Sequence, residues 1–355
     1  MYKLRVEPQW VVERPGQSGA ALPEVLSLCA ALHEHGSLAD ASKQMGVSYR
    51  HAWGLLREAG RVFGVPLVQM SRGRGAKLSA FGEKLLWADK RIAARLSPLM
   101  DTLASELQAE LERMLSRSQG MLRIHASHGF AVEALHQTLV DDGVSVEVRY
   151  VASQDALASL QSGGCELAGF HLPIGPLQAP ARQQYKKFLD AKTLRIINLA
   201  TRQQGIIVAP GNPLKIRALK DLVRPGVRFV NRQATSGTRI LFDLLLEAED
   251  IDPRRIQGYD TAEYTHAAVA AYVGSGMADA AFGVETGARR FGLDFIPIIV
   301  ERYFLACRQD ALQLPILQPT LAIMQRPQFQ TKVNALPGYD ARDAGKIMTL
   351  RQAFG

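Results

Sequence analysis

A short polar segment, Asn231–Arg239 (NRQATSGTR), carries the side chains best suited to hold a small ligand. A strand is expected to end near Asn231, and Thr235 or Ser236 can cap the helix that follows. The free N–H groups at a helix start attract anions, Gly237 leaves room for a ligand, and a nearby arginine can donate two parallel hydrogen bonds. The segment therefore predicts an anion site, with an ordinary capped helix as the alternative. Its candidate ligand-binding residues are Arg232, Thr235, Ser236, Gly237, Thr238 and Arg239.

Serine, threonine and histidine side chains follow other predicted strands and are expected to face the same ligand. Ligands of open α/β sheets lie beyond the carboxyl ends of the strands, where such side chains meet. A serine or threonine in this position is equally well explained as a helix cap, and a single histidine is more often structural. These candidates are Ser127, His128, Ser153, His171, Thr265 and His266.

Enzyme and metal signatures are missing from the sequence. It contains no GxxxxGK[ST], no HExxH and no strand-placed GxSxG, so we expect neither an enzyme nor a bound cofactor. His33 and His35 lie two residues apart and would face different directions on a helix, which argues against a metal site. The three cysteines are far apart and lack metal-ligand spacing, so we expect buried thiols in a reducing compartment.

The stretch Gly36–Ser79 has the pattern of a DNA-binding unit. Ser37 and Ser48 can each cap a short helix, and Gly46 can form the turn between the two helices. The basic SRGRGAK segment that follows is typical of a tight hairpin. Between positions 41 and 80 the chain has seven Lys or Arg residues and a single acidic residue, Glu58, although the whole chain carries a net charge of only +8. A helix-turn-helix followed by a basic hairpin predicts a winged helix that binds double-stranded DNA, with a solvated basic surface as the alternative.

This region, from Leu22 to Leu86, resembles the DNA-binding domain of LysR-type regulators, and still more that of molybdate-responsive repressors. The resemblance rests on GSLADASKQMGVSYRHAWGLLRE and GRGAKLSAFGEKLL, and it implies that Trp53 packs in the core of the domain. It also implies that the start of the second helix faces the groove, while the wing grips phosphate. The DNA-binding candidates are Ser48, Tyr49, Arg50, His51, Arg57, Arg72, Arg74 and Lys77.

A long helix is expected to follow the wing. Apolar residues recur at steps of three and four from Leu85 to Leu115, and Pro98 should kink or split this helix. A second copy of the chain is the natural partner for so long a stripe, so we expect a homodimer, with a tetramer also open. Before the winged helix, Lys3–Val12 alternates like a strand and is expected to pair with the wing.

From Met121 onward, strands alternate with helices, which predicts parallel βαβ units in an α/β fold. Strands Leu194–Leu199 and Gly205–Val208 should lead from one α/β lobe to a second, and Ile298–Cys307 should bring the chain back. We therefore predict three parts: a winged helix-turn-helix over residues 1–79, a dimerisation helix over 80–119, and a two-lobed domain over 120–355. Lobe 1 is expected at about 120–200 and 301–355, and lobe 2 at about 201–300.

The segments NRQATSGTR and ASQDALASLQSGGCELAGFHLP resemble a periplasmic-binding-protein-like domain found with molybdate-type winged helices. The resemblance implies a regulator that senses a small oxyanion such as molybdate or tungstate. It places ligand hydroxyls at Ser127 and Ser153, but Glu285 stands where molybdate-binding proteins have a tyrosine. A carboxylate there is unfavourable for a dianion unless Arg239 or Arg232 neutralises it. A small carboxylate such as formate, or a cofactor-related binding or storage module, therefore stays open.

The N-terminal segment lacks the apolar core of a signal peptide, and no apolar run approaches the roughly 20 residues that a membrane-spanning helix needs. We therefore expect a soluble cytoplasmic protein without a membrane partner.

Overall fold

The computed structural model describes residues 4–12, 20–71, 75–115 and 120–354. The chain divides into two compact units, which are described one at a time. The winged-helix unit comprises Glu7–Leu96, and the α/β unit comprises Met1–Val6 with Ser97–Gly355.

Three helices form the winged-helix unit: α1 (Pro23–His35), α2 (Leu38–Gln44) and α3 (Tyr49–Phe63). The Ser37 hydroxyl accepts a hydrogen bond from the backbone N–H of Asp40 and so caps α2. The Ser48 hydroxyl likewise accepts from the N–H of His51 at 3.1 Å and caps α3. Gly46 adopts a positive φ of 68° in the turn between them, a conformation that glycine reaches without strain. The predicted caps and turn are confirmed.

Two strands form the wing, β3 (Val68–Ser71) and β4 (Gly75–Leu78), and they pair antiparallel. Residues 4–12, the described part of the N-terminal segment, do not pair with them, so that prediction was wrong. Within those residues only Val11–Val12 forms a strand (β1), and it pairs with β2 (Ala20–Ala21). Pairing with a segment close in sequence closes a shorter loop and therefore costs less entropy.

Helix α4 runs from Ala80 to Leu115 and continues through Pro98, so it is not split there. The two compact units divide at Ser97, beside this proline. Beyond it, α4 covers β6 (Val146–Tyr150), the edge strand of the main sheet. The hydroxyls of Ser105 and Thr102 accept hydrogen bonds from the N–H groups of Val148 and Tyr150, at 2.8 and 3.2 Å. The helix thus satisfies strand donors that an open edge would leave unpaired.

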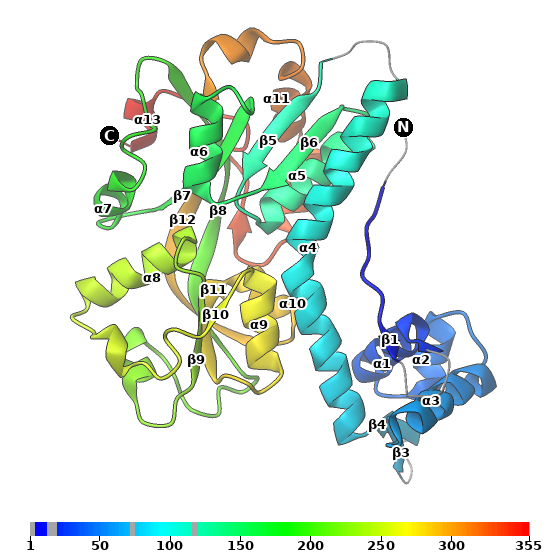
Figure 1. Ribbon diagram of the computed structural model, residues 1–355. Coiled ribbons are helices and arrows are strands. Elements are labelled where there is room, and N and C mark those ends of the chain that lie inside the picture. The colour runs from blue at the N-terminus through cyan, green and yellow to red at the C-terminus, as the bar shows by residue number, and fades with distance from the viewer. Residues whose placement is uncertain (1–3, 13–19, 72–74, 116–119, 355) are drawn as a thin grey trace. The chain divides into compact units, whose positions relative to one another are not determined.

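One sheet runs through both lobes of the α/β unit in the order β10-β9-β11-β8-β12-β7-β5-β6 (Figure 1). Lobe 1 holds β5 (Leu122–Ala126), β6 and β7 (Leu167–Pro173), with β5 parallel to both neighbours. Lobe 2 holds β9 (Phe229–Arg232), β10 (Ala262–Glu263) and β11 (Ala280–Val284), which are also parallel. The predicted α/β class is confirmed.

Two strands of 15 residues each join the lobes, β8 (Leu194–Val208) and β12 (Asp294–Arg308). They pair antiparallel from end to end, with irregularities between Pro297 and Ile299 and between Tyr303 and Phe304. The predicted pair of shorter strands before residue 208 is therefore one continuous strand. Because both connections are neighbours in one sheet, residues near their middle belong to neither lobe alone.

Helices cover both faces of the sheet and enclose four apolar clusters, two in each lobe. In lobe 1 these helices are α5 (Phe130–Asp141), α6 (Ser153–Gln161), α7 (Gln178–Gln183), α11 (Gln318–Gln325), α12 (Pro327–Asn334) and α13 (Leu350–Phe354). In lobe 2 they are α8 (Gly237–Ala248), α9 (His266–Gly274) and α10 (Glu285–Arg290). Short strands β13 (Tyr339–Asp340) and β14 (Ile347–Met348) pair with β8. Among the described residues, no helix is long and apolar enough to cross a membrane.

Candidate functional site

The start of α3 presents polar side chains to solvent. Ser48, Arg50, His51 and Arg57 are exposed, and Tyr49 is 48% exposed although it is a large aromatic residue. The opposite face of α3 buries Ala52, Leu56 and Ala59 in the core, with Trp53 packed against that core. An exposed basic helix start on a firmly packed helix has the form of a DNA recognition element.

The wing extends the same kind of surface. Lys77 is exposed on β4, while its neighbours Ala76 and Leu78 are buried in the core. Helix α4 lies close to the chain just before β3 at Gly82, because a Cβ at Gly82 would lie 2.2 Å from the carbonyl oxygen of Leu67. The predicted contacts Arg72 and Arg74 lie outside the described residues.

In the α/β unit, polar side chains of both lobes are buried together around the middle of β8 and β12. Arg232, at the end of β9, exposes only 7% of its surface. Its Nη2 donates to the carbonyl oxygen of Tyr264 at 2.9 Å, whereas Nε and Nη1 have no hydrogen-bond partner among the described residues. Burial first, and then the charge of Arg202, lower the pKa of Arg232 to about 9. Two unsatisfied donors on a buried guanidinium are costly unless an acceptor meets them.

Two histidines share this environment. Both ring nitrogens of His128, which follows β5, are buried without a partner in the described part of the chain, as is Nδ1 of His266 at the start of α9. Burial, followed by the charges of Arg232 and Arg290, lowers the pKa of His128 to about 3. Burial and Arg232 also hold the pKa of His266 well below its usual value. Both imidazoles are therefore neutral at pH 7, and each offers one donor and one acceptor nitrogen.

Glu301 on β12 connects the two lobes through hydrogen bonds. Its carboxylate accepts from Arg202 Nε at 2.9 Å and from Gln204 Nε2 at 2.8 Å, both on β8, and it contacts Nδ1 of His171 on β7. Gln204 Nε2 also lies 3.3 Å from the hydroxyl of Thr238 on α8. Burial alone would raise the pKa of Glu301, but His171 and Arg202 outweigh it and lower that pKa. Glu301 is thus an ionised carboxylate that contacts lobe 1 through His171, the connecting strand through Arg202, and lobe 2 through Gln204.

Backbone contacts bring the helix starts of both lobes to this network. A Cβ at Gly237, the first residue of α8, would lie 2.3 Å from Cε1 of His171, so only glycine lets the two lobes approach in this way. A Cβ at Gly129 would lie 3.3 Å from Nη1 of Arg202. Tyr303 donates to the carbonyl oxygen of Ser127 at 2.9 Å, with the Ser127 hydroxyl 3.0 Å from the phenol.

Several predicted ligand residues have other partners. Arg239 Nε donates to Asp243 at 3.0 Å, its guanidinium stacks on Tyr259, and its Nη1 lies 3.4 Å from the carbonyl oxygen of Arg232, so this guanidinium is already committed to partners within lobe 2. Ser236 caps α8 by accepting from the N–H of Arg239, while Thr235 is exposed in the preceding turn. The Thr265 hydroxyl caps α9 by accepting from Ala268 N–H at 2.8 Å. Ser153 is buried at the start of α6. The structure therefore gathers His128, His171, Arg232, Gly237, Thr238 and His266.

Glu285 is held within its own helix. Its carboxylate pairs with Arg289 at 3.2 Å, one turn further along α10. The side chain also packs against the backbone at Gly338, whose added Cβ would lie 2.9 Å from Glu285 Oε2. The arginine that pairs with Glu285 is therefore Arg289, and not the Arg239 or Arg232 expected from the sequence.

Three residues of the cluster were missed from the sequence: Arg202, Gln204 and Glu301. The signal in the sequence was weak, because Arg202 and Gln204 lie in the polar run Thr201–Gln204 and Glu301 is followed by Arg302. A charged side chain in such a stretch is seldom buried unless it is paired. The sequence could not show that two strands 99 residues apart place Arg202 and Glu301 side by side.

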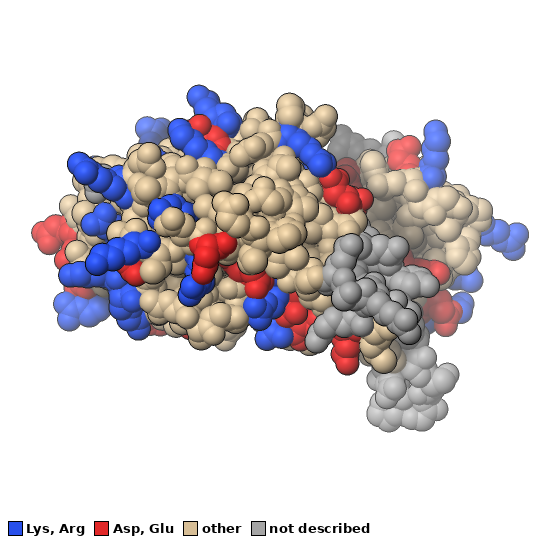
Figure 2. Space-filling view, turned by 90° about the horizontal axis from the view of Figure 1, so that it is seen from above, with Lys and Arg blue, Asp and Glu red and all other residues tan. Residues whose placement is uncertain are grey.

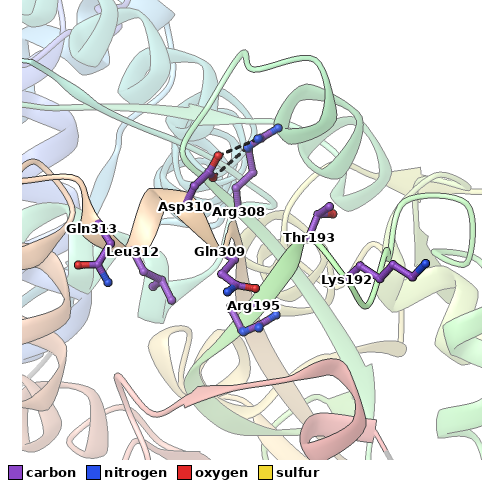
Figure 3. A pocket seen from close by; sticks show the side chains of 8 residues that line it. All are labelled: Lys192, Thr193, Arg195, Arg308, Gln309, Asp310, Leu312 and Gln313. Atoms are coloured by element: carbon purple, nitrogen blue, oxygen red, sulfur yellow. Dashed lines mark hydrogen bonds and ion pairs between the residues drawn. The ribbon is translucent and has the colours of Figure 1, made fainter.

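Surface pockets in the α/β unit have a different character. A pocket of about 550 Å³ is lined by Lys192, Thr193, Arg195, Arg308, Gln309, Asp310, Leu312 and Gln313 (Figure 3). Arg308 pairs there with Asp310 at 2.8 Å, and both side chains are more than half exposed. Figure 2 shows Lys and Arg gathered at the left end of one face. Solvated charges of this kind bind weakly, so the buried cluster is the stronger candidate.

Comparison with known proteins agrees with the two-lobed architecture. Residues 133–325, more than half of the chain, match the PBP superfamily domain. The chain belongs to the PBP superfamily. It is 32% identical over 203 residues to the uncharacterized protein YvgK of Bacillus subtilis, covering 56% of this chain and 64% of that protein. It is 30% identical over 155 residues to the molybdenum-pterin-binding protein MopB of Rhodobacter capsulatus, covering 42% of this chain and 55% of MopB.

Both matches span less than two thirds of the relatives' own length. Among solved structures, an OxyR C206 mutant from Corynebacterium glutamicum aligns with 15% identity and a TM-score of 0.44, covering 88% of this chain and 94% of that one. The fold assignment of this chain therefore stands on its own strand order and on the superfamily match.

Proposed function

We propose that this PBP-superfamily chain is a transcriptional regulator, and not an enzyme, that binds operator DNA through its winged helix and senses a small anion between its two lobes. The observation that carries the sensor is the set of buried, unpartnered nitrogens on Arg232, His128 and His266. A small anion supplies acceptor oxygens to the two Arg232 nitrogens and to the one ring nitrogen that each neutral histidine can donate. It contacts both lobes at once because Arg232 and His266 belong to lobe 2 and His128 to lobe 1.

The proposed effector is an oxyanion such as molybdate or tungstate. Tetrahedral oxyanions carry four acceptor oxygens, which suits several donors converging from different elements. The name of MopB, a molybdenum-pterin-binding protein, supports this choice, because it is 30% identical over the matched residues. Formate is the second candidate, since a single guanidinium with two unsatisfied nitrogens also suits a carboxylate.

Ligand response would arise from closure of the lobes. An anion that contacts both lobes stabilises the arrangement in which they meet, by as much as its affinity for that arrangement exceeds its affinity for others. The hydrogen bonds of Glu301 connect the two lobes, because they link His171 of lobe 1 to Thr238 of lobe 2 through Gln204.

Thermal unfolding of the full chain with molybdate, tungstate and formate tests the proposal. A true effector at a hundred times its dissociation constant should add about 2.7 kcal/mol of stability. Arg232→Gln should abolish this gain. Arg239→Gln is the matched control, because its guanidinium pairs with Asp243 and its loss should lower stability without removing the ligand response. A gain that survives Arg232→Gln, or one that is lost only with Arg239→Gln, would place the anion elsewhere.

A further inference from the structure

His128, with both ring nitrogens unpartnered, and His266, with Nδ1 unpartnered, bear on which charge state of an anion the site accepts. His128 and His266 belong to different lobes, and Arg232 acts electrostatically on both. Neither ring nitrogen of His128 has a partner in the described part of the structure, so neither is committed to a structural hydrogen bond.

Charged and titratable groups reach this site from every element around it. Lobe 1 and the connecting strands contribute Arg202, Glu301 and Tyr303 beside His171, and Glu301 is ion-paired with Arg202. Lobe 2 contributes Arg232, with Arg290 acting on His128 from α10. The remaining titratable neighbours are Tyr150, packed edge-on against His128, Glu133, on which Arg290 acts, and Glu263, paired in register with Arg232.

Arg232 is the group that an incoming anion would meet. Burial, followed by the positive charge of Arg202, disfavours the charged form of Arg232. A monoanion bound at Arg232 offsets the positive charge that lowers the pKa values of the two histidines. The histidines stay buried, however, and therefore stay neutral. A second negative charge exceeds what Arg232 can balance and favours the imidazolium form of a neighbouring histidine.

We infer that His128 and His266 set the charge with which an anion binds: a dianion enters together with one proton, taken up by this histidine pair, whereas a monoanion enters with none. The proton comes from the solvent and adds to a ring nitrogen of one imidazole, which then donates from both nitrogens. This inference rests on the proposed function and assigns the two histidines as its specificity-determining residues.

Titration calorimetry of the full chain with sodium molybdate and sodium formate tests it. Each titration is run in two buffers of different ionisation enthalpy, neither of them an oxyanion, so that the heats give the number of protons taken up. Molybdate binding should be accompanied by the uptake of about one proton. The affinity for molybdate should therefore fall about tenfold per pH unit as the pH rises from about 6.5 to about 8.5. Formate binding should take up close to no protons, and its affinity should be independent of pH over the same range.

The double variant His128→Gln with His266→Gln should lose the proton uptake, since glutamine keeps hydrogen-bonding groups but does not titrate. Its folding is checked by circular dichroism and by its urea transition. His136→Gln is the matched control, because His136 lies on α5 outside the cluster and should leave the proton count unchanged.

Molybdate binding without proton uptake, uptake that persists in the double variant, or exclusion of molybdate at low as well as high pH would each overturn the inference while anion sensing stands. If neither anion binds at any pH, the proposed function fails and the inference fails with it.

Discussion

Replacing His128 and His266 with glutamine should make the stability of the α/β unit less dependent on pH. In the folded chain, burial and Arg232 lower the pKa of His128 to about 3 and that of His266 well below 6.5. In the unfolded chain, both titrate near the ordinary value of 6.5. Because folding lowers these pKa values, the unfolded state binds more protons below pH 6.5. The stability is therefore fully present above that pH and is lost as the pH falls toward the folded values.

The size of the effect follows from the unfolded state alone, because neither folded histidine takes up a proton in this range. Between about pH 7.5 and about pH 5.5, each unfolded histidine gains about 1.4 kcal/mol from protonation, or about 2.7 kcal/mol for the pair. The wild-type chain should lose this much more stability than the double variant over the same interval. Other titrating groups are common to both proteins, so the difference isolates the two histidines.

Urea unfolding followed at the two pH values, without added anion, measures this difference. His35→Gln provides the control, because this exposed histidine belongs to the winged-helix unit and should not alter the transition of the α/β unit. Equal pH dependence in the wild type and the double variant would refute the reasoning, since it would mean that the two imidazoles take up protons as readily in the folded chain as in the unfolded one.

Three further outcomes are expected from other surfaces. Leu99 and Leu103 on α4 are 53% and 43% exposed, so replacing both with Lys should put unpaired charge into a dimer seam and yield monomers in sedimentation, whereas persisting dimers would move the interface elsewhere. Arg50→Ala should relax the choice of one base pair and weaken binding to the right site by about 1–3 kcal/mol in gel-shift titrations. Lys77→Ala should weaken binding to all DNA sequences alike and reduce the slope of log affinity against log salt concentration by about 1. Unchanged operator affinity in both the Arg50 and the Lys77 variant would argue against DNA binding by the winged-helix surface.

Local patterns predicted the elements well, because their signals lie close together in the sequence. Ser37, Gly46 and Ser48 each act within a few residues, and the structure has the predicted caps and turn. The continuous strands β8 and β12 were harder to predict. Arg202 and Glu301 each stand next to other polar residues in the sequence, and only their pairing across the sheet explains why both are buried.

The sequence named only some of the residues that the structure brings together at the candidate site. The NRQATSGTR segment points to both of its arginines equally, since each lies close to a helix start. The structure separates them by their partners: Arg239 lies one helical turn from Asp243 and pairs with it, whereas Arg232, at the end of β9, keeps two nitrogens without a partner among the described residues. A sequence segment cannot reveal that difference, because it depends on which distant groups reach each guanidinium.

In the proposed sensor, the same unsatisfied nitrogens explain why the lobes would respond to a ligand at all. Each buried polar group without a partner costs about 1–3 kcal/mol, and Arg232, His128 and His266 together bury five such nitrogens. Bringing the lobes together without an anion is therefore unfavourable, even though Glu301 accepts hydrogen bonds from Arg202 and Gln204 in that arrangement. An anion that accepts from several of these nitrogens removes the cost only when the lobes meet. Its binding energy then becomes a preference for closure, and a coupling of roughly 1–3 kcal/mol suffices to change operator affinity by five- to 150-fold.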